Sequence, residues 1–265
     1  MTTSTPIPLA LSPHLLEVAH ALLAARQAGS APADAVQLAD RVGSADDAYA
    51  IQDWLLRTLD GAAALPRHWK SGGPSRDAPL THAPLPAGGI LTRPADARTL
   101  PLRQHRIEAE IALRLGREVD AAQAALLTPE SAAALIDGMA VSIELVDSRW
   151  APAAAATALA KLADLANHGA LVLGEWQAYA PRDWLGQLCT VHIGENAPVR
   201  FTGTHSLGDP AWLLPGWLRH LTRHGARVPP GTVVTTGSWC GLLSAAPGDR
   251  VRADFEGIGQ ASVLL

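Results

Sequence analysis

The stretch from Ile107 to Gly116, IEAEIALRLG, alternates strictly between apolar side chains and the residues between them. This period of two predicts a β-strand with one packed face, formed by Ile107 and every second residue after it. Glu108 and Glu110 lie on the other face, two residues apart, where like charges repel each other and reduce stability. The fold must compensate these two carboxylates, and this requirement constrains where the strand can be placed.

A second strand-like run, from Val141 to Arg149, places Glu144 in an otherwise apolar context. An unpaired charge among buried apolar side chains is costly, so Glu144 needs a partner. Three carboxylates in strands indicate a divalent cation, because hard cations prefer oxygen ligands. Two other interpretations stay open: a solvated Glu-x-Glu face, and an ion pair between Glu144 and Arg106 or Arg149.

The composition is that of a globular protein with a substantial core. Hydrophobic residues make up 48% of the 265-residue chain and charged residues 17%, which argues against global disorder. The formal net charge is −4 and no long basic run exists, so nucleic acid and membranes are poor candidates for partners. Cys189 and Cys240 lack metal-site spacing and indicate free thiols in a reducing compartment. With no signal peptide at Met1–Pro6 and no transmembrane helix expected, we predict a cytoplasmic protein.

Helical patterns fill the first sixty residues and predict an N-terminal cap. Helices are expected at 13–29, 33–41 and 45–59, and Ser44 is the expected N-cap of the last. A short strand then ends at Lys70 and opens into a Gly-, Pro- and Ser-rich loop that extends to about residue 89. Such a long loop is often a lid over a site. Lys70 is either a surface lysine or a cation placed for an anionic substrate or for proton transfer.

The remainder of the chain shows helices, strands and turns without an internal repeat. Helices are expected at 120–135 with a start at Thr128, at 152–166 and at 208–221; strands are expected at 170–174 and 232–236 and in hairpins at 186–201 and 251–265. His168, beside a glycine turn, is either a satisfied loop histidine or a site residue. The sequence contains no Gly-x-Gly-x-x-Gly, P-loop or Gly-x-Ser-x-Gly motif.

Seven short motifs stand in an order that is typical of one enzyme family. They are DAYAIQ at 47–52, WKSG at 69–72, EAEIA at 108–112, IELVDSR at 143–149, GALVLG at 169–174, TGS at 236–238 and PGD at 247–249. From about residue 45 onward the chain resembles the 2-keto-4-pentenoate hydratase family within the fumarylacetoacetate hydrolase superfamily. The resemblance implies an α+β fold in which a mixed β-roll, residues 66–265, encloses the site and residues 1–65 form a helical cap.

The same resemblance implies a set of site residues. Mg²⁺ or Mn²⁺ is expected to be held by Glu108, Glu110 and Glu144. The expected catalytic residues are Lys70, Ser238 and Arg149. The expected substrate contacts are Trp239, Asp147, Ser148 and His82.

The implied activity is metal-dependent lyase chemistry on a small 2-oxo acid, and we predict hydration of a 2-hydroxy-2,4-dienoate. A 2-oxo acid can chelate a hard cation through its carboxylate and 2-oxo oxygen, and the cation then stabilises an enolate. A decarboxylase of the 4-oxalocrotonate type forms the same enolate by losing CO₂, so the motifs do not separate the two reactions. Two further alternatives are an acylpyruvate-type C–C hydrolase, which needs a His-Glu pair such as His20 and Glu17, and a catalytically poor structural partner of an active subunit.

The chain departs from the family pattern at three places, one of which is the Asp164-Leu165 position, where relatives tend to have Asp-Asn and the asparagine here is missing or displaced to Asn167. The run THAPLP at 81–86 has no acid where hydratases usually carry one in the lid. Trp239 follows Ser238 where smaller polar residues are common, so it could shorten the pocket or stack on a planar substrate. Relatives form homo-oligomers, which predicts one here, and a pathway decarboxylase is a further candidate partner. Trp212 and Trp217 are assigned either to a subunit contact or to the core.

Overall fold

The computed structural model describes residues 11–61 and 65–265; residues 1–10, with the stretch inspected for a signal peptide, and residues 62–64 lie outside the described part. A large sheet carries the site. Its nine strands are β2 His68–Gly72, β3 Thr81–Pro84, β4 Ile90–Leu91, β6 Arg106–Leu115, β7 Ile136–Val146, β9 His168–Leu173, β10 Gln177–Ala178, β13 Val233–Thr235 and β14 Leu243–Ser244. Their order is β3-β2-β13-β6-β7-β9-β4, with β10 paired to β7 and β14 paired to β6.

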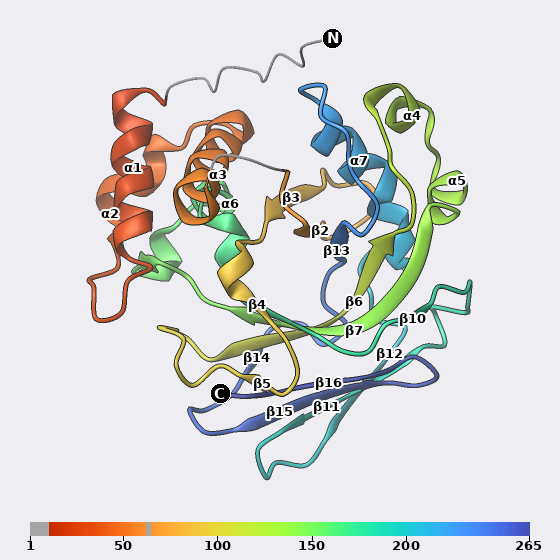
Figure 1. Ribbon diagram of the computed structural model, residues 1–265. Helices are drawn as coiled ribbons and strands as arrows, with labels where there is room; N and C mark the ends of the chain where they lie inside the picture. The colour runs from red at the N-terminus through yellow and green to blue at the C-terminus, as the bar shows by residue number, and fades with distance from the viewer. Residues whose placement is uncertain (1–10, 62–64) are drawn as a thin grey trace.

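A second sheet lies beneath the large one in Figure 1, and the large sheet curls away from it. Its five strands, in spatial order, are β12 Val199–Thr202, β11 Leu188–Ile193, β15 Arg250–Phe255, β16 Gly259–Leu264 and β5 Ala95–Asp96. The large sheet combines antiparallel pairs with two parallel ones, β13 with β2 and β4 with β9. The mixed, curled sheet confirms the predicted fold class, and both predicted hairpins form.

Strand β6 forms as its alternation predicts, but both of its faces are covered. Ile107 and the apolar residues in step with it enter the main core, while Glu110 and Ala112 on the other face are also buried. Strands β6 and β7 pair antiparallel over their whole length, with Glu108 opposite Glu144 and Glu110 opposite Ser142. This register brings the acidic positions of two separate sequence runs together.

Helices flank the curled sheet on two sides (Figure 1). They are α1 Pro13–Ala24, α2 Ala35–Leu38, α3 Ala45–Asp60, α4 Ala121–Leu126, α5 Pro129–Ala133, α6 Ala158–Ala163 and α7 Leu214–Thr222. The predicted N-caps are confirmed: Ser44 accepts from the backbone of Asp47, and Thr128 from that of Ser131. In the part of the chain that the structure describes, no helix is long and apolar enough to cross a membrane.

Several predicted elements differ from the structure, including the following three. The first helix ends at Ala24 rather than at residue 29. The predicted loop after Lys70 contains strand β3, which pairs antiparallel with β2. The predicted helix at 152–166 is α-helical only at Ala158–Ala163, because a 3-10 turn precedes it and left-handed residues follow it.

The N-terminal helices build a core that is separate from that of the sheets, and later residues complete it. Trp150, Leu162 and Leu165 pack into this core beside residues of α1 and α3. A parallel pair of short strands, β1 Ala33–Asp34 and β8 Trp150–Ala151, joins the same two parts of the chain. The division into a cap at 1–65 and a catalytic domain at 66–265 therefore stays a prediction. In the main core Trp217 is fully buried and Trp212 is half-buried.

Candidate active site

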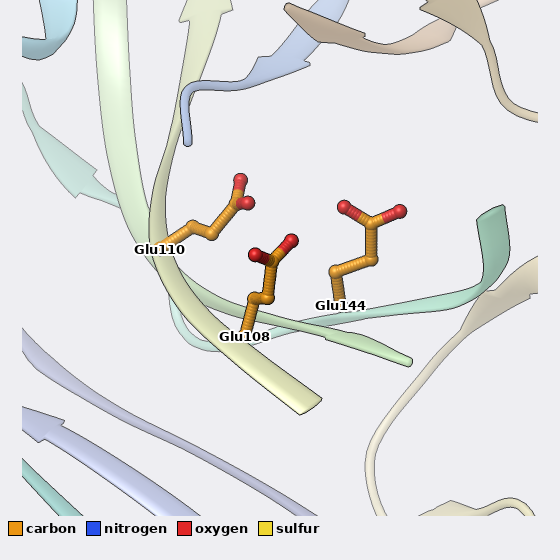
Figure 2. Close-up of side chains that lie close together, drawn as sticks. All are labelled: Glu108, Glu110 and Glu144. Atoms are coloured by element: carbon orange, nitrogen blue, oxygen red, sulfur yellow. The ribbon is translucent and has the colours of Figure 1, made fainter. Parts of the chain in front are cut away.

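Three carboxylates meet above the paired strands β6 and β7. Figure 2 shows Glu108 and Glu110 rising from β6 and Glu144 from β7, with their carboxylates on the same side and turned toward one another. One carboxylate oxygen from each lies within 4.8 Å of the others. Glu110 and Glu144 are buried, and Glu108 is half-buried. A solvated Glu-x-Glu face is therefore excluded, and the like charges require counter-charge.

Lys70, on the neighbouring part of the sheet, supplies one positive charge. Its Nζ donates to Glu144 Oε1 at 2.7 Å and to the backbone carbonyl of Ala166 at 3.2 Å. His168 Nδ1 lies 3.2 Å from the same oxygen of Glu144. Glu144 therefore pairs with Lys70 rather than with either arginine considered from the sequence. Lys70 thus contacts the carboxylate cluster directly.

Glu110 is held by a different set of donors, all from the end of β13 and the turn after it. The Thr235 hydroxyl donates to Glu110 Oε2, and the Gly237 backbone N–H donates to the same oxygen at 3.0 Å. Gly237 has φ +105°, a conformation that glycine adopts and other residues resist. The Thr-Thr-Gly sequence thus folds into a turn that fixes the orientation of one carboxylate.

The four charges shift one another's pKa values. Burial, strengthened by the charge of Glu144 and opposed by Lys70, raises the pKa of Glu108 to about 7. Burial and the two neighbouring carboxylates raise the pKa of Glu110 to about 8. Burial acts on Glu144 as well, but Lys70 and His168 outweigh it and lower the pKa of this carboxyl. Burial opposes the charge of Lys70, yet the three carboxylates raise its pKa. At neutral pH the Lys70–Glu144 pair is therefore ionised, while Glu110 is mostly protonated and Glu108 is about half-protonated.

The donor set fits a hard divalent cation. When all three glutamates are ionised, their carboxylates outnumber the single lysine, and the cluster then lacks positive charge. Glu144 Oε2 is buried and has no hydrogen-bond partner among the described residues. A cation would bind carboxylate oxygens of all three glutamates and displace the protons that Glu108 and Glu110 hold. Mg²⁺ and Mn²⁺ match this oxygen-only set.

A cavity of about 360 Å³ opens onto the carboxylates. Its lining residues are Lys70–Pro74, Thr81–Ala83, Glu108, Glu110, Ala166, Ser206, Gly237 and Ser238. Five residues predicted for the site thus line one cavity: Lys70, His82, Glu108, Glu110 and Ser238. Its volume suits a small organic acid rather than a polymer.

Ser71 and His82 form a hydrogen-bonded pair in the wall of this cavity. They face each other across strands β2 and β3, with Ser71 Oγ 2.8 Å from His82 Nδ1. Successive side chains on a strand point to opposite faces, so this pair lies on the other side of β2 from the Lys70 side chain. His82 also packs against the ring of His220, with ring centroids 4.6 Å apart. Burial lowers the pKa of His82 to about 3, so the imidazole is neutral.

The structure places five predicted site residues outside the cavity lining: Glu144, which joins the carboxylate cluster from β7, and the four that follow. Trp239 is buried in the main core, where its ring packs against His205, Trp184 and Phe255. Ser148 is buried and its hydroxyl accepts from the Trp150 backbone at 3.3 Å. Asp147 and Arg149 line a second cavity of about 240 Å³, beside the N-terminal helices. Trp239 can therefore neither shorten the cavity at the carboxylates nor stack on a substrate there without moving.

Arg149 belongs to a buried ion-pair cluster behind the site. Its Nε donates to Asp164 Oδ1 at 2.7 Å, and its backbone N–H donates to Asp164 Oδ2 at 2.9 Å. Arg26, from the N-terminal part, donates to Asp164 Oδ1 at 3.2 Å. Burial and the charge of Arg149 lower the pKa of Arg26 to about 10, which leaves it charged at neutral pH.

Sequence reasoning did not identify several groups that hold the site. The Thr235 hydroxyl, the Gly237 N–H and the Ala166 carbonyl all contact the charged cluster. A signal existed for the first two, because Thr-Thr-Gly ends a predicted strand in a turn. A backbone carbonyl carries no sequence signal, so Ala166 could not have been found without the fold.

Comparison with known proteins finds similar sequences and a similar fold. The model of the fumarylacetoacetate (FAA) hydrolase C-terminal domain matches residues 65–263. A 2-keto-4-pentenoate hydratase of Paraburkholderia xenovorans (strain LB400) is 29% identical over 173 residues, which cover 62% of this chain and 61% of the hydratase. A 4-oxalocrotonate decarboxylase of a Pseudomonas species is 25% identical over 158 residues, 59% of each chain. The matched segment thus spans about three fifths of the length of these curated relatives.

A solved structure shares almost the whole fold. The 4-oxalocrotonate decarboxylase from Pseudomonas putida G7, complexed with calcium and acetate, superposes with a TM-score of 0.79 at 19% identity and covers 95% of this chain and 96% of its own. The same decarboxylase was also solved with magnesium and adipate, at a TM-score of 0.79 and 20% identity. Divalent cations therefore bind a protein of this fold, and the similarity includes the N-terminal helices.

Proposed function

Because the chain belongs to the fumarylacetoacetate hydrolase family, we propose that it is a metal-dependent lyase that hydrates a 2-hydroxy-2,4-dienoate. The observation that carries this proposal is the convergence of Glu108, Glu110 and Glu144 beside Lys70, next to a small cavity that Lys70, Glu108 and Glu110 line. The 29% identity to a 2-keto-4-pentenoate hydratase supports the same reaction class.

The reaction adds water to a conjugated acid in two steps. The 2-hydroxydienoate is first ketonised: its 2-hydroxyl loses a proton and C5 gains one, which leaves a double bond between C3 and C4. Water then adds across this bond, with the hydroxyl on C4 and the proton on C3, and gives a 4-hydroxy-2-oxo acid. A bound Mg²⁺ or Mn²⁺ would supply Lewis-acid stabilisation of the negative charge on the 2-oxo oxygen.

In this proposal, residues of the chain supply a proton to the substrate and orient it. Lys70 keeps a proton on Nζ at neutral pH, because the carboxylates around it raise its pKa. It therefore acts as a hydrogen-bond donor to the substrate carboxylate or as the acid that protonates carbon. Ser238, whose hydroxyl donates to the Gly241 carbonyl at 2.9 Å, lies on the same cavity and is placed to orient the substrate.

Decarboxylation of a 2-oxo diacid is the second candidate, and it is favoured by the close fold match to a 4-oxalocrotonate decarboxylase. A diacid carries a second carboxylate that needs its own counter-charge. Among the described residues that line the cavity, Lys70 is the one cation, and it already pairs with Glu144. The other lining residues include small or neutral ones such as Gly73, Thr81 and Ser206. This lining favours a substrate with an uncharged tail, as in the hydratase reaction.

The hydrolase alternative finds less support in the contacts of its proposed catalytic pair. Glu17 forms an ion pair with Arg41, and His20 packs edge-on against Trp54 with ring centroids 5.1 Å apart. Neither Glu17 nor His20 is among the residues that line the cavity. A catalytically poor structural partner is disfavoured because the three carboxylates and Lys70 are all in place. It should tolerate Glu110→Gln without loss of pathway flux.

A spectrophotometric assay tests the proposal. Purified protein is mixed with 2-hydroxypenta-2,4-dienoate in the presence of Mg²⁺, Mn²⁺ or EDTA, and the loss of dienol absorbance is followed with product analysis. We expect metal-dependent formation of 4-hydroxy-2-oxopentanoate, and none with Glu108→Ala. A matched control is Glu175→Gln, an exposed acid paired with Arg93, which should retain full activity.

A parallel reaction with a 2-oxo diacid separates the two lyase candidates. CO₂ release from the diacid, without turnover of the dienoate, would replace hydration by decarboxylation. Metal binding without turnover of either substrate would reject both reactions and leave only the three-carboxylate metal site.

A further inference from the structure

We propose that three residues behind the site, the buried Arg149 and Asp164 and the half-buried Arg26, position Lys70 by holding the backbone turn at residues 165–167. We call these three residues the arginine clamp. The inference rests on the proposed lyase function for its kinetic readout, and it has a second readout that does not depend on activity. It assigns to Arg149 a positioning role in place of direct substrate contact, and it gives Arg26, far away in the sequence, the same role.

The turn at residues 165–167 has an unusual backbone. Leu165, Ala166 and Asn167 adopt φ values of 50°, 51° and 60°, so three successive residues other than glycine are left-handed. Such residues persist only where surrounding contacts hold them, and they concentrate at functional sites. The turn therefore needs external support, and its neighbours should show it.

The arginine clamp supplies that support at one end of the turn. Asp164, immediately before it, is fully buried and receives hydrogen bonds from the Arg149 side chain, the Arg149 backbone and Arg26. Arg149 Nη2 also donates to the Asp164 carbonyl at 3.2 Å. At the other end, the Asn167 carbonyl accepts from the Asp147 backbone at 2.8 Å, and the Asp147 carboxylate lies 3.5 Å from Arg149. Both ends of the turn are thus tied to Arg149.

The middle of the turn contacts the catalytic lysine. The Ala166 carbonyl accepts from Lys70 Nζ at 3.2 Å, while Glu144 accepts from the same nitrogen at 2.7 Å. These two acceptors fix the direction of the ammonium group toward the cavity. Because a shift of about 1 Å in a reacting group can cost on the order of 100-fold in rate, the turn matters for the chemistry. The clamp acts on Lys70 through this carbonyl and does not touch the substrate cavity.

The composition of the chain makes a direct test possible. The sequence contains two lysines, Lys70 and Lys161, so amine labelling reports on the catalytic lysine with a built-in reference. We would label wild-type protein and Arg26→Ala by reductive methylation under the same metal conditions and quantify both lysines by peptide mass spectrometry. The expected result is a several-fold faster modification of Lys70 relative to Lys161 in the variant. In the dienoate assay we expect kcat to fall about 10-fold or more with little change in KM.

Guanidinium rescue separates positioning from loss of stability. Arg26 lines the second cavity, so added guanidinium ion can reach the space that Arg26→Ala leaves. We expect it to restore both the slow labelling of Lys70 and kcat. Arg26→Lys, which keeps the charge without the planar fork, should give an intermediate effect and remains informative if the alanine variant does not fold. The matched control is Arg93→Ala, an exposed arginine paired with Glu175, which should change neither readout.

The outcomes distinguish this inference from the proposed function. Unchanged Lys70 labelling and unchanged kcat in a variant with a lower melting temperature would overturn the inference, since the arginine clamp would then only stabilise the fold. Wild-type protein that turns over no substrate would reject the proposed function, while the labelling ratio would still decide whether the clamp positions Lys70.

Discussion

Thr235 shows how the orientation of a metal ligand depends on a neutral neighbour. Its hydroxyl donates to Glu110 and lies 2.9 Å from the hydroxyl of Ser142, which stands opposite Glu110 on β7. In metal sites, partners of this kind fix the ligand and are worth about 10–100-fold in affinity. Without this hydroxyl, the Glu110 carboxylate would keep only the Gly237 N–H as a donor and would be held less firmly.

Replacing Thr235 by valine removes the hydroxyl and keeps the shape. We expect Thr235→Val to weaken Mn²⁺ binding by about 10-fold or more, measured by isothermal titration calorimetry, with the fold intact by circular dichroism. Thr232→Val is the control, since Thr232 is equally buried but donates to the Pro229 carbonyl. Equal affinities in the two variants would show that the Thr235 hydroxyl does not orient the ligand.

The raised pKa values of Glu108 and Glu110 predict the pH dependence of the metal-free protein. Both carboxyls hold protons in the folded state up to about pH 7 and 8, whereas the unfolded chain has released them. The folded state therefore binds more protons in this window, and the free energy of unfolding falls as pH rises from 7 to 8.5. Above pH 7 the buried histidines, whose pKa values are lowered, are neutral in both states and contribute little.

Urea denaturation in EDTA at several pH values measures this slope. We expect Glu110→Gln to have a flatter slope than wild type, because the amide does not titrate. Excess Mg²⁺ should also reduce the fall in the free energy of unfolding of wild type with rising pH, since the cation binds the deprotonated carboxylates. A wild-type stability that rises across this window in EDTA would contradict the raised pKa values.

At the scale of elements, the two sheets meet at a glycine. Gly174 follows β9, and its N–H donates to the Val141 carbonyl of β7 at 2.8 Å. A side chain at this position would overlap the Gln260 carbonyl oxygen on β16, so only glycine lets the second sheet approach. The last glycine of the GALVLG motif is therefore needed for the two sheets to pack against each other.

We expect Gly174→Ala to destabilise the protein by about 1–3 kcal/mol, as overpacking usually does. Thermal denaturation of the variant measures the loss. Gly88→Ala is the control, because a methyl group there would meet no atom within 4 Å. If Gly174→Ala and Gly88→Ala have the same melting temperature, the two sheets can move apart at Gly174 without loss of stability.

Helices and strands could be predicted where their sequence signal is local. The prediction was wrong where an element depends on contacts with remote residues. Strands β6 and β7 and the caps of α3 and α5 follow from alternation and from single capping residues. Strand β3 is short and lies in a loop-like sequence, so only its pairing with β2 defines it. The helix predicted at 152–166 was too long because its alanines favour helix, whereas remote contacts of Asp164 hold the left-handed turn.

Site residues, too, could be predicted where their sequence signal is local. The acidic residues of β6 and β7 were found because a charge is conspicuous in an apolar strand. Trp239 was assigned to the substrate because it follows Ser238 in sequence. Its ring instead enters a core built from distant segments that include Trp184 and Phe255, which no local pattern reveals.

For the molecule as a whole, cation binding and stability are linked. A cation that binds only the folded state stabilises it by about 2.7 kcal/mol at a concentration 100 times its dissociation constant. We expect the melting temperature to rise with added Mg²⁺ or Mn²⁺, measured by differential scanning fluorimetry. Glu108→Gln should lose most of this rise, whereas Glu175→Gln should keep it. Equal shifts in both variants would indicate cation binding elsewhere.

The shared core of the N-terminal helices has a consequence for biosynthesis. These helices leave the ribosome before the segment that completes their core, because Trp150 and the residues of α6 are made about 100 residues later. At roughly 5–20 residues per second, that interval is on the order of 5–20 s, during which the apolar faces of α1 and α3 are exposed to the cell. The nascent chain is therefore a natural client for ribosome-associated chaperones until residue 165 has emerged.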